Sequence, residues 1–159
     1  MSATLTGRHV SETGQLEFTE AEITRQALVH SSALTYLMVA YARECGQSPE
    51  HVAEFAGRVF TKGWARHVDQ DALGIIRSIA LIVVAIGGEV VSISGDSLEA
   101  EVRATGVITA EDAQFFGITR DEADRFCNVF VPMAASLGYV FTWRRDGNEL
   151  IYTVRRAAF

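Results

Sequence analysis

Two histidines are the first candidates for chemistry, because an imidazole side chain exchanges protons near neutral pH. His30 lies in an apolar stripe at helical spacing, and we expect its ring to point into the interior. Its neighbours on that face offer no hydrogen-bond acceptor, so its partner is expected from another element, water or a ligand. His30 is either a satisfied core histidine or an acid/base group, and His67 either caps a helix end or belongs to a site.

Cys127 is the candidate nucleophile. It lies inside a helical segment that begins with acidic residues, so neither the helix dipole nor its neighbours favour a thiolate. Phe126 and Phe130 lie close to it in the sequence, which favours a packing role as a small apolar residue. As a nucleophile it would need a base, and His30 or His67 would have to reach it across the fold.

Trp64, Tyr36 and Tyr41 are the candidates for binding a substrate. The Trp64 ring would form the floor of a pocket for a planar ligand or anchor the core, and either tyrosine would donate a hydroxyl hydrogen bond. The sequence contains no P-loop, no Gly-rich dinucleotide loop, no Gly-x-Ser-x-Gly turn and no His-Glu-x-x-His helix. We therefore predict no metal and no cofactor.

Two helices that carry these residues are delimited by capping signals. The first begins at Thr19, which forms a capping box with Glu22, and it ends at Cys45-Gly46. The second begins at Ser48-Pro49, with a cap and a proline at the first helical position. Because only a short gap separates them, we expect an antiparallel helical hairpin that buries the apolar stripe of each helix. The stripe of the first helix comprises Ile23, Ala27, Leu34, Leu37, Met38 and Tyr41.

A nearly unbroken apolar run from Leu73 to Ile86 is the centre of the chain. The run is too long for a strand and, with Arg77 inside it, too short for a membrane-spanning helix, so we predict a core helix over 69–86. Asp69 is the expected N-cap, and Gly87-Gly88 is the expected end. The residues expected to be mostly buried are Ile79, Leu81, Ile82, Val83 and Ile86.

Two hairpins are predicted from alternating apolar residues. Strands 89–94 and 98–104 flank a Ser-Gly-Asp-Ser turn, and strands 139–144 and 149–155 flank Asp146-Gly147. Joined into one sheet, they give an α+β fold in which the helical N-terminal half packs on one face of a four-stranded antiparallel sheet.

Helices are also expected between the two hairpins. Thr109 and Thr119 cap them, and Pro132 is expected to kink or split the second near Val131. We expect residues 1–18 to form a flexible arm and residues 19–159 to form a single domain.

The composition restricts the partners of the chain. A net charge of −6 and a pI of about 5.2 argue against nucleic acid, because a phosphate backbone requires clustered cations. Two cysteines and no signal peptide indicate a reducing cytoplasm. With 48% hydrophobic residues and a mean hydropathy of +0.14, the 159-residue chain is unusually apolar, which implies a large core, a cavity or a homodimer interface. We expect a homodimer and no membrane contact.

A family resemblance is carried by RVFTKGWARH at 58–67, by the apolar helix with its hairpin, and by ADRFCNVF with the final strands. Over residues 19–156 their order resembles the L-2-amino-thiazoline-4-carboxylic acid hydrolase-like family, and it is similar to vinyl-reductase-type small-molecule-binding domains. The resemblance implies a small-molecule pocket between helices and sheet. Vinyl-reductase-type domains often carry cysteines near the closing strands, whereas this chain has none after Cys127, which argues against a metal or redox site.

These observations predict a protein of secondary metabolism that binds a small organic metabolite. As an enzyme it would be a cofactor-independent hydrolase, cyclase or isomerase that uses His30, His67 and Cys127. The alternative is a non-catalytic ligand sensor or an oligomeric assembly module. If His30 serves the site, its replacement by Asn or Gln removes binding or turnover while the fold remains.

Overall fold

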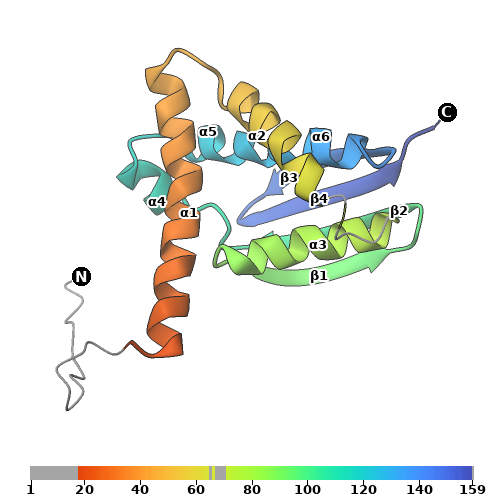
Figure 1. Ribbon diagram of the computed structural model, residues 1–159, viewed down its shortest axis with the longest axis horizontal. Helices are drawn as coiled ribbons and strands as arrows, with labels where there is room; N and C mark the ends of the chain where they lie inside the picture. The colour runs from red at the N-terminus through yellow and green to blue at the C-terminus, as the bar shows by residue number, and fades with distance from the viewer. Residues whose placement is uncertain (1–17, 65, 67–70, 159) are drawn as a thin grey trace.

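Four antiparallel strands form one sheet in the computed structural model, which describes residues 18–64, 66 and 71–158. They are β1 (Glu89–Gly95), β2 (Glu99–Thr105), β3 (Tyr139–Asp146) and β4 (Glu149–Arg156), arranged in the order β1-β2-β4-β3 (Figure 1). The central pair takes one strand from each hairpin and places Val102 opposite Tyr152. The predicted α+β fold, with two hairpins joined in one sheet, is confirmed.

Both hairpin turns occur close to where the sequence predicts them. In the first, the Asp96 carboxylate accepts hydrogen bonds from the backbone N–H groups of Leu98, at 2.8 Å, and Glu99, at 3.2 Å. In the second, Asp146 pairs with Glu149, so the turn falls at positions 147–148, one residue later than expected. Gly147 has a φ of +59°, a conformation that glycine adopts without a steric penalty.

The core helix is α3 (Ala72–Ala85), which packs on β1, β2 and β4. Its N-cap is Asp71, whose side chain accepts a hydrogen bond from the Gly74 N–H at 2.7 Å. The predicted cap Asp69 was therefore the wrong residue, and it lies outside the described part of the chain. The helix ends before Gly87, which has a φ of +93°, as expected.

Only one side of α3 is covered, although the helix is apolar on nearly every side. Ile79 and Val83 are buried, as predicted, whereas Ile82 and Ile86 are half-buried. Leu81 is 70% exposed, so the prediction that it is buried was wrong. The sheet contacts α3 on one side. An apolar sequence without periodicity does not indicate which of its residues face the sheet.

Helix α1 (Glu20–Glu44) has the predicted boundaries and the predicted Thr19–Glu22 capping box. Its buried residues are Tyr36, Val39 and Ala42, on the side opposite the predicted stripe. Apart from Met38, which is half-buried against the core, the stripe faces outward and Leu34 is 58% exposed, so the expectation that it would be buried was wrong. Figure 1 shows α1 at one end of the molecule, with its N-terminal half extending beyond the other helices and the sheet.

Helix α2 (Pro49–Trp64) begins after Ser48, whose hydroxyl accepts a hydrogen bond from the His51 N–H at 3.2 Å. It packs mainly on the segment 125–135 rather than on α1. Its buried residues are the small ones, Ala53, Ala56 and Gly57, because they allow a close approach. The large apolar residues Phe55, Val59 and Phe60 remain more than half exposed.

Four short helices connect the hairpins: α4 (Ala110–Phe115), α5 (Arg120–Asp124), the 3₁₀ helix η1 (Arg125–Val129) and α6 (Phe130–Ala135). Thr109 and Thr119 cap α4 and α5, as predicted. The break occurs at η1, before the position expected from Pro132. Proline lacks an N–H group and its ring collides with the carbonyl four residues earlier, so the preceding turn adopts the tighter 3₁₀ form.

The core lies where α3 and α6 cover the sheet, and α6 packs on β3. No helix in the described part of the chain is long and apolar enough to cross a membrane. The predicted arm, apart from Phe18, lies outside the described residues.

Candidate functional site

A cavity of about 480 Å³ lies between the helices and the sheet. Its walls come from α1, α2, α3, the segment after β2, η1, α6 and β4, and most of the side chains in them are apolar. The residues that line it are Thr35, Phe60, Gly63, Trp64, Ile82, Val83, Ile86, Val107, Ile108, Phe126, Cys127, Val129, Phe130, Met133 and Tyr152.

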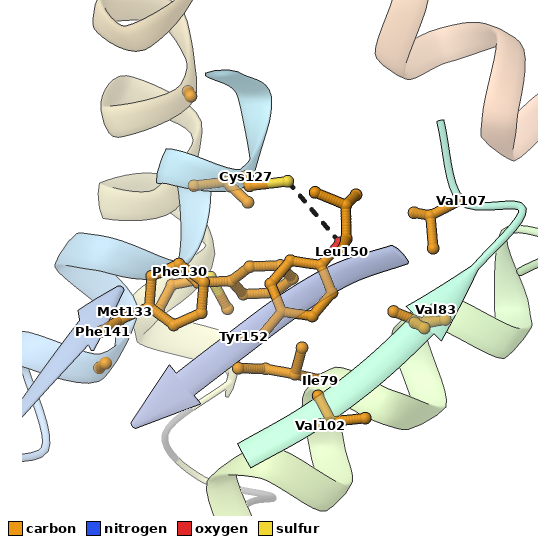
Figure 2. Packing of buried hydrophobic residues seen from close by; sticks show 14 of the residues in the cluster. Ile79, Val83, Val102, Val107, Cys127, Phe130, Met133, Phe141, Leu150 and Tyr152 are labelled. Carbon is orange, nitrogen blue, oxygen red and sulfur yellow. Dashed lines mark hydrogen bonds between the residues drawn. The ribbon is translucent and has the colours of Figure 1, made fainter. Parts of the chain in front are cut away.

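Cys127 and Tyr152 form a hydrogen-bonded polar pair in the lining of this cavity. Figure 2 shows their side chains pointing toward each other, and the thiol donates a hydrogen bond to the Tyr152 hydroxyl oxygen, with a sulfur–oxygen distance of 3.7 Å. With the thiol as the donor, the hydrogen of that hydroxyl stays available, because it makes no other hydrogen bond among the described residues. The Tyr152 hydroxyl is thus a hydrogen-bond donor that a bound molecule can use.

Burial keeps both groups in their protonated forms. Loss of hydration raises the pKa of the Cys127 thiol to about 12. The same cause raises the pKa of Tyr152 well above its usual value. A thiol with such a pKa is a poor nucleophile at neutral pH, because the thiolate is the reactive form.

Aromatic packing fixes the Tyr152 ring. Its centroid lies 6.2 Å from that of Phe130 and 6.1 Å from that of Phe141. Strand pairing places Trp143 opposite Tyr152, on the sheet face that carries the core. Tyr152 is not among the site residues predicted from the sequence, although its alternation with Leu150 and Val154 marks it as an inward-facing residue with a hydroxyl group.

The sequence-predicted site residues are only partly brought together. Trp64 and Cys127 both line the cavity, and Trp64 is half-buried at the end of α2. His67 lies outside the described residues, so its predicted role stays a prediction.

His30 is exposed and does not line this cavity. Its Nε2 atom lies 3.0 Å from Nε2 of Gln26, one turn earlier on the same helix. The expectations of an inward-pointing ring and of a partner from outside the helix were therefore wrong. The physical reason is that α1 buries its other side.

The two predicted tyrosines lie elsewhere. Tyr36 is buried, its hydroxyl oxygen accepts a hydrogen bond from the Thr109 N–H at 3.1 Å, and its ring stacks on Phe116 at 5.4 Å. Burial raises the pKa of Tyr36. The hydrogen bond of its hydroxyl group links α1 to the start of α4. Tyr41 is 67% exposed, and a hydrogen bond with Cys45 raises its pKa.

A buried ion pair lies beside the cavity. Asp124 is 4% exposed, and Arg145 donates two hydrogen bonds to its carboxylate. The same guanidinium donates to the carbonyl oxygens of Ile108, at 3.3 Å, and Asn148, at 3.4 Å. Because the two charges satisfy each other, the pair adds no net charge to this wall.

Comparisons with known proteins do not assign a family. The chain matches no family model, and no curated protein is detectably similar to it in sequence. The resemblance noted in the sequence therefore stays a prediction. Among the described residues, no group of three His, Cys, Asp or Glu side chains is arranged to hold a metal ion.

Proposed function

We propose that this protein binds a small, uncharged, mainly apolar organic molecule in the cavity around Tyr152. The observation that carries the proposal is an apolar cavity of about 480 Å³ with an available hydroxyl donor in its wall. Cavities that bind small molecules are typically apolar, with a few polar groups that set orientation, and range from about 300 to about 1,000 Å³.

The walls also define the chemistry of the ligand. A carbonyl or ether oxygen would accept the Tyr152 hydrogen bond, while the rest of the molecule would contact groups such as Met133 and Ile82. A charged group would be unfavourable, because burying an unpaired charge is costly and the nearby Asp124 and Arg145 already pair with each other.

The described walls support binding rather than catalysis. Cys127 and Tyr152 are the titratable groups of the described lining, and burial keeps both protonated at neutral pH. We therefore favour a ligand sensor or carrier over a hydrolase, cyclase or isomerase. An acid/base role for His67 stays a prediction, since that residue lies outside the described structure.

A neutral fluorescent probe tests whether the cavity binds apolar molecules. N-phenyl-1-naphthylamine should bind the wild-type protein, and Met133→Trp should weaken binding at least about tenfold, because the larger ring occupies the space. Leu81→Trp is the matched control, since Leu81 is exposed on α3. Absence of probe binding, or an equal loss in the control, would contradict the proposal.

Two ligands of similar shape test the hydrogen bond. Benzophenone has a carbonyl acceptor and diphenylmethane has none, and each can be measured by displacement of the probe. Tyr152→Phe should weaken the binding of benzophenone about five- to tenfold, which is the usual contribution of one neutral hydrogen bond. The binding of diphenylmethane should be unchanged. Equal effects on both ligands would show that the hydroxyl does not contact the ligand.

We also propose that the chain associates with a second copy of itself. Large apolar side chains remain exposed, including Leu37 at 54% and Phe115 at 83%. Apolar surface of this kind on a small protein is typical of an interface.

A further inference from the structure

Helix α1 carries an apolar seam on its exposed side. Its members alternate at spacings of four and three residues, which is the heptad pattern of a coiled coil. They are Ile23, Ala27, His30, Leu34, Leu37 and Tyr41. Each is exposed, and Ile23 and Tyr41 at the two ends are 59% and 67% exposed.

The seam lies opposite the side of α1 that contacts the rest of the chain. That side is buried through Tyr36, Val39 and Ala42, whereas none of residues 20–35 is buried. An isolated helical segment of about 15 residues is marginal in water, so tertiary contacts normally stabilise a helix of this kind. The N-terminal half of α1 has the apolar residues for such contacts but does not bury them against the described part of the chain.

We propose that the seam of α1 pairs with the seam of a second copy of this chain, in antiparallel orientation. The seam is self-complementary in that direction, because its members are symmetric about position 32. Ile23 would pack on the partner's Tyr41, Ala27 on the partner's Leu37, and His30 on the partner's Leu34. The inference rests on the proposed self-association and names its surface.

Side-chain volume favours the antiparallel pairing over a parallel one. In the antiparallel pair Ala27, the one small residue of the seam, faces a leucine. A parallel pair would place Ala27 against its own copy and leave a gap, which well-packed interfaces avoid. The antiparallel arrangement also places opposite ends of the two helix dipoles together.

The positions that flank the seam carry no charge. They are occupied by Thr24, Gln26, Ser31, Ala33, Met38 and Ala40, so two copies would approach without like-charge repulsion. Several of these side chains are small, which allows a close approach of the two helices. Glu20 and Glu44 occupy the next heptad positions at the two ends, and they limit the seam to residues 23–41.

A shallow groove beside the seam supplies a receptor for the partner helix. It is lined by His30, Ala33, Leu34, Leu37 and Phe116. The adjacent Phe115 ring contacts Phe116 edge-on at 5.2 Å and is itself 83% exposed. The apolar surface thus continues from α1 onto the end of α4.

A charge substitution in the seam tests the surface. Wild-type protein should sediment as a dimer at micromolar concentration, and Leu34→Glu should raise the dimer dissociation constant on the order of 100-fold. Val29→Glu is the matched control, because Val29 is 56% exposed on the same helix but lies outside the seam. Circular dichroism verifies that each variant is folded.

The outcomes separate the two proposals. A wild-type monomer at every concentration would overturn both the self-association and its surface. A Leu34→Glu variant that remains as dimeric as the wild type would overturn the surface and leave the self-association standing. Equal dissociation of Leu34→Glu and Val29→Glu would also overturn the assignment to this seam.

Disulfide crosslinking tests the orientation, in a Cys45→Ser background that removes the exposed cysteine of α1's C-terminus. Ile23→Cys and Tyr41→Cys lie about 27 Å apart along one helix, so only antiparallel pairing brings them together. Under oxidation the double variant should form a covalent dimer, and neither single variant should. Crosslinking of the single variants with themselves would overturn the antiparallel arrangement.

Discussion

Loss of hydration determines the protonation state of the Cys127 side chain. Its pKa of about 12 lies above the ordinary value of 9.0, so folding favours the protonated thiol. When folding raises the pKa of a group, the group's stabilising contribution is fully present at pH values below its pKa in the unfolded state. This contribution is lost as the pH rises through the pKa of the folded state. The relevant window therefore extends from about pH 9 to about pH 12.

We expect the free energy of unfolding of the wild-type protein to fall as the pH rises above 9. Cys127→Ala should show a smaller fall between pH 9 and pH 11, which urea unfolding at several pH values would measure. Cys45→Ala is the control, because Cys45 is exposed, and it should retain the wild-type slope. Identical slopes in all three proteins would mean that the thiol is not shielded from water.

At the scale of single residues, the sequence predicts part of the cavity lining. Trp64 and Cys127 were recognised from residue type and helical context, and both line the cavity. His30 was misplaced because the periodicity of α1 locates an apolar stripe without showing whether the chain itself covers it. Tyr152 gains its importance from the burial of its hydroxyl next to Cys127, a contact between residues 25 positions apart.

At the scale of the elements, α2 depends on a close approach at Gly57. A Cβ atom at this position would collide with the carbonyl oxygen of Val129 and with the ring of Pro132. Gly63, two turns later on the same helix, has no atom within 4 Å of the position that a Cβ would occupy. The two glycines therefore form a matched pair for testing how α2 packs.

Gly57→Ala should lower the free energy of unfolding by about 1–3 kcal/mol, because the helix must move away from η1 and α6. Gly63→Ala should raise it by up to about 1 kcal/mol, since alanine is the better helix former and meets no obstacle. Chemical denaturation of both variants is the measurement. A neutral or stabilising Gly57→Ala would contradict the packing of α2 described above.

Element boundaries could be predicted well because local interactions determine them. The caps at Thr19, Thr109 and Thr119 depend on hydrogen bonds within one turn, and the sequence contains both partners. The covered face of each helix depends on distant residues, as Leu81 shows. The early break at η1 likewise reflects how Pro132 affects the preceding turn, which a residue pattern does not locate.

At the scale of the whole molecule, the proposed self-association would couple to folding. If two copies pair only when α1 is formed, the melting temperature of the wild-type protein should rise with protein concentration. Leu34→Glu should abolish this dependence, whereas Val29→Glu should retain it. Thermal unfolding at concentrations from about 1 to about 100 µM would measure both effects. A wild-type melting temperature that is independent of concentration would contradict the expectation.

The fold class was predictable because two hairpins separated by helices leave few ways to bury their apolar faces. The apolar composition left a cavity as one of three alternatives, and the family resemblance implied a pocket between helices and sheet. Its volume depends on how far α2 stands from α3 and β4, and this spacing comes from contacts between distant parts of the chain, such as the close approach of Gly57 to Val129 and Pro132.

The ion pair of Arg145 has a consequence for the path by which a molecule reaches the interior. Arg145 donates hydrogen bonds to the carbonyl oxygen of Ile108 and to the carboxylate of Asp124. These bonds hold one wall of the cavity in place. On another wall, the Phe60 ring is 53% exposed. Exposed side chains change rotamer within nanoseconds, whereas breaking a buried ion pair is strongly unfavourable in free energy. Uptake and release would therefore leave the wall held by Arg145 in place and would occur on a side of the cavity that has exposed lining residues, such as Phe60.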